Sequence, residues 1–297
     1  MREHTPFRPR YSQLTARRTV SEGDPPSSPF ASLSSSLGLV ASSLIARAHR
    51  FGHGDGDGHG DGDMDDVLAQ FREQATDLHE RVVHDHGVFV VEFLGATGGG
   101  KTTLVERLIE RAPEDERIGV VVGDVAGDDD ASRFRDLGVA VANVTTGKEC
   151  HLDPGMLEEA LNEFDLDALD RLYVENVGNM VCPADFPLGA QARVLVVSTT
   201  EGDDVVRKHP LLFEACDAAV VNKVDIAEAV GADVSRMHED IAEVAPGMDV
   251  FETNAREDVG VDALADFLKT TRTHGHQHGH ADDHQHDHDH AHEHTHD

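Results

Sequence analysis

A glycine-rich stretch at residues 95–103 constrains what this chain can fold into more than any other feature. Its sequence, Gly95-Ala-Thr-Gly98-Gly99-Gly100-Lys101-Thr102-Thr103, fits the pattern G-x-x-x-x-G-K-[ST] at every fixed position. An apolar run at 88–94 precedes it, and helical spacing of apolar residues begins at Leu104. In such a unit, backbone N–H groups and the positive end of the helix surround phosphate oxygens. We therefore expect Lys101 to reach the β- and γ-phosphates of a nucleotide and the Thr102 hydroxyl to ligate Mg²⁺.

From residue 64 onward, segments with helical spacing of apolar residues alternate with short apolar strands. This alternation predicts an α/β fold, the three-layer arrangement of P-loop NTPases, in which helices cover both faces of a mainly parallel sheet. Strands are expected at 87–94, 118–122, 139–144, 171–175, 193–198, 218–221 and 249–252. Helices are expected at 64–82, 101–112, 153–164, 203–215, 233–244 and from 261 onward.

The two ends differ in composition from this middle part. Residues 1–63 combine an Arg- and Ser-rich segment with a Gly/Asp/His linker, and we expect them to be disordered. An alternative is that translation starts at Met64. Residues 64–270 form the predicted nucleotide-binding domain, and 271–297 form a histidine-rich tail. Imidazole binds Ni²⁺, Cu²⁺ and Zn²⁺, so the tail is predicted to bind metal through His274, His276, His278, His280, His284, His286, His288, His290, His292, His294 and His296.

The chain carries 57 acidic and 25 basic residues, a formal charge of −32. Such a surface repels nucleic acid and anionic membranes, so we expect neither as a partner. The acidity fits adaptation to very high salt, or the collection of metal ions. The sequence has no run of about 18 apolar residues and no recognisable export signal, and its three cysteines are too few for a disulfide framework. We therefore expect a cytoplasmic protein with reduced thiols.

The tetrad Asn222-Lys223-Val224-Asp225 follows an expected strand and predicts selectivity for guanine. A carboxylate accepts hydrogen bonds from the N1–H and N2–H₂ groups of guanine, a pattern of donors that adenine lacks. The predicted nucleotide is therefore GTP. A second loop that contacts the base is expected at Asn254 and Ala255, just past the last strand.

Two acids at the ends of expected strands are candidate catalytic residues together with Lys101 and Thr102. Glu175, in Glu175-Asn-Val-Gly178, ends an expected strand and could hold Mg²⁺ through water, while the Gly178 backbone N–H could meet the γ-phosphate. Asp124 follows the second strand, and residues 127–130 form an acidic segment there. We expect this segment to be a mobile loop that closes on Mg²⁺ when GTP is bound.

Two thiols and an imidazole form a candidate metal site. Cys150-His151 and Cys182 both follow strands, so they are expected at the edge of the sheet that carries the nucleotide. Such ligands suit Zn²⁺ or Ni²⁺, and three of them leave a position open or shared across a dimer. Cys216 precedes its strand, so we interpret it as a structural residue.

The segments Thr146-Gly-Lys-Glu-Cys150-His151-Leu-Asp and Glu175-Asn-Val-Gly-Asn-Met-Val-Cys182-Pro resemble those of the hydrogenase nickel-incorporation GTPases (HypB), in the G3E group of metal-chaperone GTPases. The resemblance covers about 64–268. It implies a dimerising GTPase that binds nickel and zinc and inserts nickel into hydrogenase, with the hydrogenase large subunit and other maturation proteins as partners. It also implies that Lys101 and Thr102 contact phosphate and Mg²⁺, that Asp225 contacts guanine, and that Cys150, His151 and Cys182 bind metal. The amino-terminal C-x-x-C-G-C motif of some members is absent.

Other functions stay open at this stage. A urease-type nickel GTPase is expected to read Cys-Pro-His where this chain reads Cys-His, and a cobalamin-linked G3E protein would serve another client. The chain could also be a metal-storage protein regulated by nucleotide, whereas the guanine tetrad disfavours a small-molecule kinase. Within the GTPase interpretation, we expect residues 175–182 to couple nucleotide and metal, because Gly178 and Cys182 are four residues apart.

Overall fold

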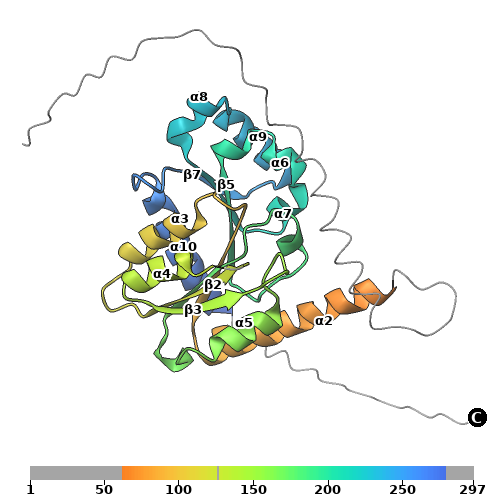
Figure 1. Cartoon of the computed structure of the whole chain (residues 1–297), viewed down its shortest axis with the longest axis vertical. Helices are drawn as coiled ribbons and strands as arrows, with labels where there is room; N and C mark the ends of the chain where they lie inside the picture. Colours follow the sequence, from red (N-terminus) through yellow and green to blue (C-terminus); the bar gives the residue numbers. More distant parts are fainter. Residues whose placement is uncertain (1–61, 126, 279–297) are drawn as a thin grey trace, which may run out of the picture. The chain divides into compact units, whose positions relative to one another are not determined.

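The computed structural model describes residues 62–125 and 127–278 (Figure 1). The predicted amino-terminal segment and most of the linker lie outside the described residues. So do the tail histidines from His280 onward. Residues 62–278 belong to one compact unit of the chain.

Seven described strands form one parallel sheet, as the alternating pattern predicted. Residues of the central strands are buried on both faces, which is typical of parallel sheets covered by helices. Each predicted strand corresponds to an observed one within two residues. In spatial order the strands are β3 (Ala140–Thr145), β2 (Ile118–Asp124), β4 (Arg171–Glu175), β1 (Phe89–Leu94), β5 (Ala192–Ser198), β6 (Ala218–Asn222) and β7 (Asp249–Thr253).

Helices cover both faces of the sheet, which gives the expected three layers (Figure 1). One face packs against α3 (Lys101–Glu110), α4 (Asp129–Asp136) and α10 (Val261–His278). The other face carries two separate apolar clusters. The first contains α2 (Gly62–His79), the π-helix Glu80–Asp85 and α5 (Pro154–Leu161), and the second contains α6 (Val205–Lys208), α7 (Pro210–Glu214) and α9 (Val234–Val244).

Local sequence signals explain where several helices begin. The Asp153 carboxylate accepts a hydrogen bond from the Met156 N–H at 2.8 Å, and Pro154 occupies the first position of α5, where a missing N–H costs nothing. Asp233 caps α9 in the same way, through the Arg236 N–H. Because these caps satisfy N–H groups that a helix start leaves unpaired, they fix both boundaries close to the predicted ones.

Two predictions of local structure are wrong. The single helix expected at 203–215 is two short helices, α6 and α7, because Pro210 begins a new helix after His209. The acidic segment expected to be a mobile loop instead contains the start of α4 at Asp129. The Asp128 carboxylate, just before it, pairs with Arg135 at 2.8 Å, so local ion pairing favours a helix there.

The described part of the chain, 62–125 and 127–278, includes no helix that is both long and apolar enough to cross a membrane. The last helix, α10, extends past residue 270, the expected domain boundary, to His278.

Candidate functional site

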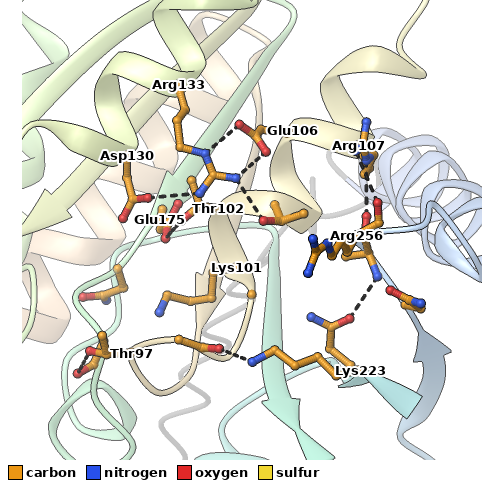
Figure 2. Close-up of a pocket in the computed structure, with 18 of the residues that line it drawn as sticks. Thr97, Lys101, Thr102, Glu106, Arg107, Asp130, Arg133, Glu175, Lys223 and Arg256 are labelled. Atoms are coloured by element: carbon orange, nitrogen blue, oxygen red, sulfur yellow. Dashed lines mark hydrogen bonds and ion pairs between the residues drawn. The ribbon is translucent and has the colours of Figure 1, made fainter. Parts of the chain in front are cut away.

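A cavity of about 800 Å³ opens at the carboxyl ends of the central strands. Its walls come from segments far apart in the sequence: the loop after β1, the ends of β2, β4 and β6, and the loop after β7. Figure 2 shows Lys101, Glu175 and Arg133 reaching this cavity from three different elements. The volume suits a nucleotide-sized ligand, and the predicted residues that line it are Gly98, Gly100, Lys101, Thr102, Thr103, Asp124, Glu175, Gly178, Asn222, Lys223, Asp225, Asn254 and Ala255.

The glycine-rich loop has the geometry that its sequence predicts. Helix α3 begins at Lys101, directly after Gly100, which has a φ of 105°. A Cβ at residue 100 would also collide with the Asn222 amide, so glycine is required there for two reasons. The Lys101 ammonium donates to the carbonyls of Gly95 and Ala96 at 3.1 and 3.2 Å, and burial lowers its pKa. Gly95 and Gly99 shape the loop but do not line the cavity.

One carboxylate oxygen of Glu175 is suited to bind a cation beside the phosphate loop. The Thr102 hydroxyl donates to its Oε1 at 2.8 Å, whereas its Oε2 is buried without a hydrogen-bond partner among the described residues. Burial raises the pKa of Glu175 to about 7, although Lys101 and Thr102 act in the opposite direction. Asp124 also borders the cavity and accepts from the Val125 N–H at 2.6 Å. A hydroxyl, a carboxylate oxygen without a partner and a second carboxylate are the hard oxygen ligands that Mg²⁺ prefers.

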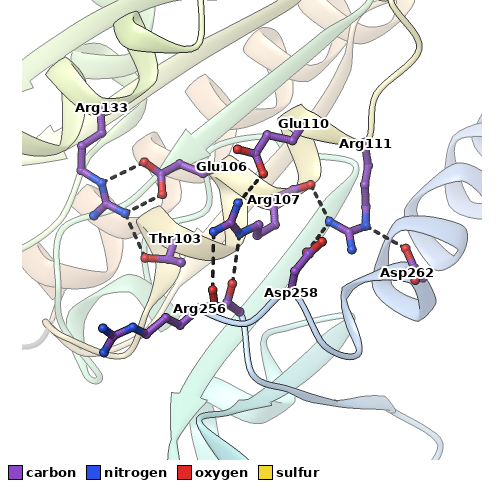
Figure 3. A network of polar contacts seen from close by, with 10 residues as sticks. Thr103, Glu106, Arg107, Glu110, Arg111, Arg133, Arg256, Asp258 and Asp262 are labelled. Carbon is purple, nitrogen blue, oxygen red and sulfur yellow. Dashed lines mark hydrogen bonds and ion pairs between the residues drawn. The ribbon is translucent and has the colours of Figure 1, made fainter. Parts of the chain in front are cut away.

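An arginine that the sequence analysis did not identify also lines the cavity. Arg133, on α4, donates to both carboxylate oxygens of Glu106 at 2.9 and 2.5 Å and to the Thr103 hydroxyl at 2.9 Å (Figure 3). It also lies 3.4 Å from Asp130, one turn earlier on α4. Asp130 and Arg133 are three residues apart, a spacing that makes two side chains neighbours on a helix. The sequence analysis predicted a loop at this segment and so did not interpret the spacing as a pair.

The guanine-tetrad residues connect two loops of the site. The Asn222 amide donates to the Gly99 carbonyl at 2.9 Å and accepts from the Thr253 hydroxyl at 3.0 Å and the Ala255 N–H at 3.1 Å. The observed bonds of Asn222 thus join the phosphate loop to the loop after β7. Lys223 also contacts the phosphate loop, since its ammonium donates to the Gly98 carbonyl at 2.6 Å.

Further contacts hold the end of the cavity that contains Asp225 and Asn254 in place. The Arg107 guanidinium donates to the carbonyls of Ala255 and Arg256 (Figure 3). Asp225 lines the cavity at the start of a 3₁₀ turn, and the Asn254 side chain accepts from the Glu257 N–H at 3.2 Å.

Cys150, His151 and Cys182 come together as predicted, with their candidate ligand atoms all within 4.8 Å of one another. These three side chains are called the metal cluster below. The two sulfur atoms lie 2.8 Å apart, and the Cys150 Sγ lies 3.7 Å from the His151 Nδ1. Burial lowers the pKa of His151, which favours the neutral ring that binds metals. Its ring also stacks on Phe186, with 3.8 Å between ring centroids. Cys216 lies apart from this metal cluster, packed against the apolar cluster of α6, α7 and α9.

Asn179, which the sequence analysis did not single out, connects the two sites directly. Its backbone N–H donates to the Gly95 carbonyl at 3.1 Å, and its side-chain amide donates to the Cys150 carbonyl at 3.2 Å. Next to it, Gly178 lies against Thr97 so closely that a Cβ would collide with the Thr97 hydroxyl. The segment between Glu175 and Cys182 therefore contacts the phosphate loop and the metal cluster at once.

Of the predicted tail ligands, three fall within the described residues. The backbone of His274, His276 and His278 continues α10, and the remaining tail histidines lie outside the described residues.

A family model, a curated relative and two solved structures that resemble this chain all include HypB in their descriptions. A family model described as the CobW/HypB/UreG nucleotide-binding domain matches residues 89–252. The probable hydrogenase maturation factor HypB of Methanocaldococcus jannaschii is 40% identical over 204 residues, which cover 69% of this chain and 92% of that protein. Two solved structures also match: HypB from Archaeoglobus fulgidus, 43% identical with a TM-score of 0.64, and HypB from Helicobacter pylori in complex with nickel, 33% identical with a TM-score of 0.66. They cover 69% and 71% of this chain and 99% of their own lengths.

Proposed function

This chain belongs to the HypB group of the CobW/HypB/UreG family, and on that premise we propose that it is a GTP-hydrolysing nickel chaperone that serves the maturation of a nickel enzyme. The relatives named as hydrogenase maturation factors favour [NiFe]-hydrogenase as the client, with its large subunit and other maturation proteins as partners. The Helicobacter pylori relative, solved with nickel, supports nickel as the cargo.

The observation that carries the proposal is the contact of Asn179 with both sites. A chaperone must hold its metal in one state and release it in another, so metal affinity has to depend on a second ligand. The Asn179 backbone N–H donates to the carbonyl of Gly95, the first glycine of the phosphate loop. Its side-chain amide donates to the carbonyl of Cys150, a candidate metal ligand. A shift of the 176–182 segment on nucleotide binding would therefore change the position of Cys150 relative to Cys182.

The nucleotide site supports GTP and Mg²⁺. Asp225 borders the cavity where it can accept from guanine. Thr102 would hold Mg²⁺, with Glu175 and Asp124 as the neighbouring carboxylates. The ion would neutralise charge on the phosphates during hydrolysis. Lys101 and Arg133 line the same cavity, and positive groups held there stabilise the charge that develops as the phosphoryl group is transferred.

The metal site supports nickel or zinc as the bound ion. Two sulfur atoms and one imidazole nitrogen form a soft ligand set, and three protein ligands leave room for a further ligand. A second copy of the chain is one source of that ligand, which makes a homodimer part of the proposal.

Nickel titrations in two nucleotide states test the proposal on the full-length chain. Free Ni²⁺ is set with a chelator buffer, and binding is followed by Ni–thiolate absorption, which the tail histidines do not produce. We expect the affinity to differ at least about fivefold between GDP and a non-hydrolysable GTP analogue. The double variant Cys150→Ser/Cys182→Ser, which removes both candidate thiolate ligands, should abolish the signal, whereas Cys216→Ser should keep it. Equal affinities in the two states would contradict nucleotide-controlled release.

Asn179→Ala tests the path of the coupling. The variant keeps the backbone bond to Gly95 but loses both side-chain bonds, the one to the Cys150 carbonyl and the one from the Val181 N–H, which lies next to Cys182. We expect it to bind GTP like the wild type and to show a smaller difference in nickel affinity between the two states. A full difference in this variant would show that the coupling takes another route.

A further inference from the structure

Glu92 is a charged residue in the middle of the central strand β1, and its side chain is completely buried. Side chains alternate between the two faces of a strand, so Glu92 points to the same face as Val90 and Leu94. Val90 belongs to the apolar cluster of α2 and α5, and Leu94 belongs to that of α6, α7 and α9. Glu92 therefore lies at the boundary between the two clusters, where an apolar side chain would also be expected.

One carboxylate oxygen of Glu92 leads to the Cys150-His151 segment. Its Oε1 accepts from the Asn176 amide at 2.8 Å, and the Asn176 Oδ1 in turn accepts from the Leu152 N–H at 2.9 Å. Leu152 directly follows His151. The orientation of the Asn176 amide is fixed by these bonds, because the carboxylate can only accept and the Leu152 N–H can only donate.

The other oxygen of Glu92 leads to the Cys182 segment. Its Oε2 accepts from the Arg193 Nε at 2.9 Å, and the Arg193 Nη2 donates to the Pro183 carbonyl at 2.7 Å. Pro183 directly follows Cys182. A third donor of the same guanidinium, Nη1, bonds the Ala215 carbonyl at 2.8 Å, so each of its nitrogen atoms has a protein acceptor.

We propose that Glu92 is a positioning residue for the metal cluster, whose two oxygens hold, through Asn176 and Arg193, the two segments that carry His151 and Cys182. This inference rests on the proposed function of Cys150, His151 and Cys182 as the nickel site. A fixed distance between the two segments holds the candidate ligands in place before the metal binds. The side chains then lose less conformational freedom on binding, which raises the affinity for the metal.

The cost of burying these charges argues against a purely stabilising role. Removing a carboxylate and a guanidinium from water costs several kcal/mol per ion, and well-packed apolar replacements of a buried ion pair are often neutral or stabilising. The apolar clusters on either side of Glu92 would accept such replacements. The charged pair supplies something that an apolar pair cannot, namely directional bonds to two backbone groups next to metal ligands.

Two variants of the full-length chain test the inference through the Ni–thiolate absorption at buffered free Ni²⁺. The first is Glu92→Gln, which leaves Arg193 without its carboxylate. The second is the double variant Glu92→Leu/Arg193→Met, which fills the space with apolar atoms. We expect both to bind nickel at the cluster about tenfold more weakly or worse. The double variant should nevertheless unfold at a urea concentration equal to or above that of the wild type.

Glu116→Gln is the matched control. Glu116 is also a buried carboxylate paired with arginines, Arg171 at 2.9 Å and Arg272 at 2.6 Å, but it lies before β2, at the opposite edge of the sheet from the metal cluster. It should lose stability like Glu92→Gln and keep wild-type nickel affinity. Wild-type nickel affinity in the stable double variant would overturn the positioning role.

The proposed function and this inference fail in different ways. If Cys150→Ser/Cys182→Ser keeps the Ni–thiolate signal, the metal site itself is wrong. If that variant loses the signal while Glu92→Leu/Arg193→Met binds nickel like the wild type, the site stands and only the role of Glu92 is refuted.

Discussion

Replacing Asn222 by alanine distinguishes two roles for this residue, contact with the nucleotide and connection of two loops. The sequence predicts the first, from the guanine tetrad. In the structure, the buried Asn222 amide makes three hydrogen bonds, to Gly99, Thr253 and Ala255. The second role requires the variant to be destabilised even when no nucleotide is bound.

The magnitude follows from these bonds. Each contributes about 1 kcal/mol net, and a buried group left without a partner costs about 1–3 kcal/mol. All three partner residues are buried, so water does not readily replace the lost bonds. We expect Asn222→Ala to lose about 3 kcal/mol of unfolding free energy, a large part of the roughly 5–15 kcal/mol typical of a domain.

Urea unfolding of the nucleotide-free protein measures this loss. The dependence of free energy on urea should be unchanged, because the surface exposed on unfolding is the same. Asn254→Ala is a suitable control, since the Asn254 side chain accepts a single bond, from the Glu257 N–H, and should lose only about 1 kcal/mol. If Asn222→Ala unfolds like the wild type and loses only GTP binding, the connecting role is refuted.

Two further predictions concern the nucleotide site, and a third concerns the histidine-rich tail. Asp225→Asn should weaken GTP binding about a hundredfold or more, because the amide presents donors where guanine also donates, and fluorescent-nucleotide titration checks this. The raised pKa of Glu175, about 7 in the folded chain against 4.5 ordinarily, means that the folded state binds this proton more tightly than the unfolded state. The resulting stability is present below pH 4.5 and is lost as the pH rises through about 7. Between pH 4.5 and pH 8, the unfolding free energy of the wild type, measured in urea, should therefore fall by about 3 kcal/mol more than that of Glu175→Gln. Removing residues 279–297 should lower the number of nickel ions bound and leave GTP hydrolysis nearly unchanged, whereas loss of nearly all function would favour a storage protein.

Local patterns were sufficient to predict the fold class and the ligand types. Strand 171–175 was predicted with its observed bounds because its apolar run ends at Glu175 and has clear polar neighbours. Parallel strands bring their carboxyl ends to one edge, so Lys101, Glu175 and Asp225 were expected around one cavity from chain order alone. The same reasoning predicted that Cys150, His151 and Cys182 would lie together at that edge of the sheet.

Local interactions other than the spacing of apolar residues decided what the sequence analysis missed. Arg133 borders the cavity only because α4 begins at Asp129, and the competition between a loop and a short helix depends on ion pairs such as Asp128 with Arg135. The breaking of the 203–215 helix depends on local backbone geometry at His209 and Pro210. Periodicity of apolar residues contains neither kind of information.

The sequence by itself determined which chemical groups this protein brings to its site: a phosphate loop, a guanine acceptor, two thiols and an imidazole. Only the tertiary structure decided which groups hold these in place. Asn179 contacts Gly95 and Cys150, and Glu92 connects through Asn176 and Arg193 to both metal-ligand segments. A motif specifies residue types at short spacing, whereas the contacts of Asn179 with Cys150 and of Glu92 with Asn176 and Arg193 join residues that lie between 29 and 101 positions apart, so they exist only after the sheet has formed.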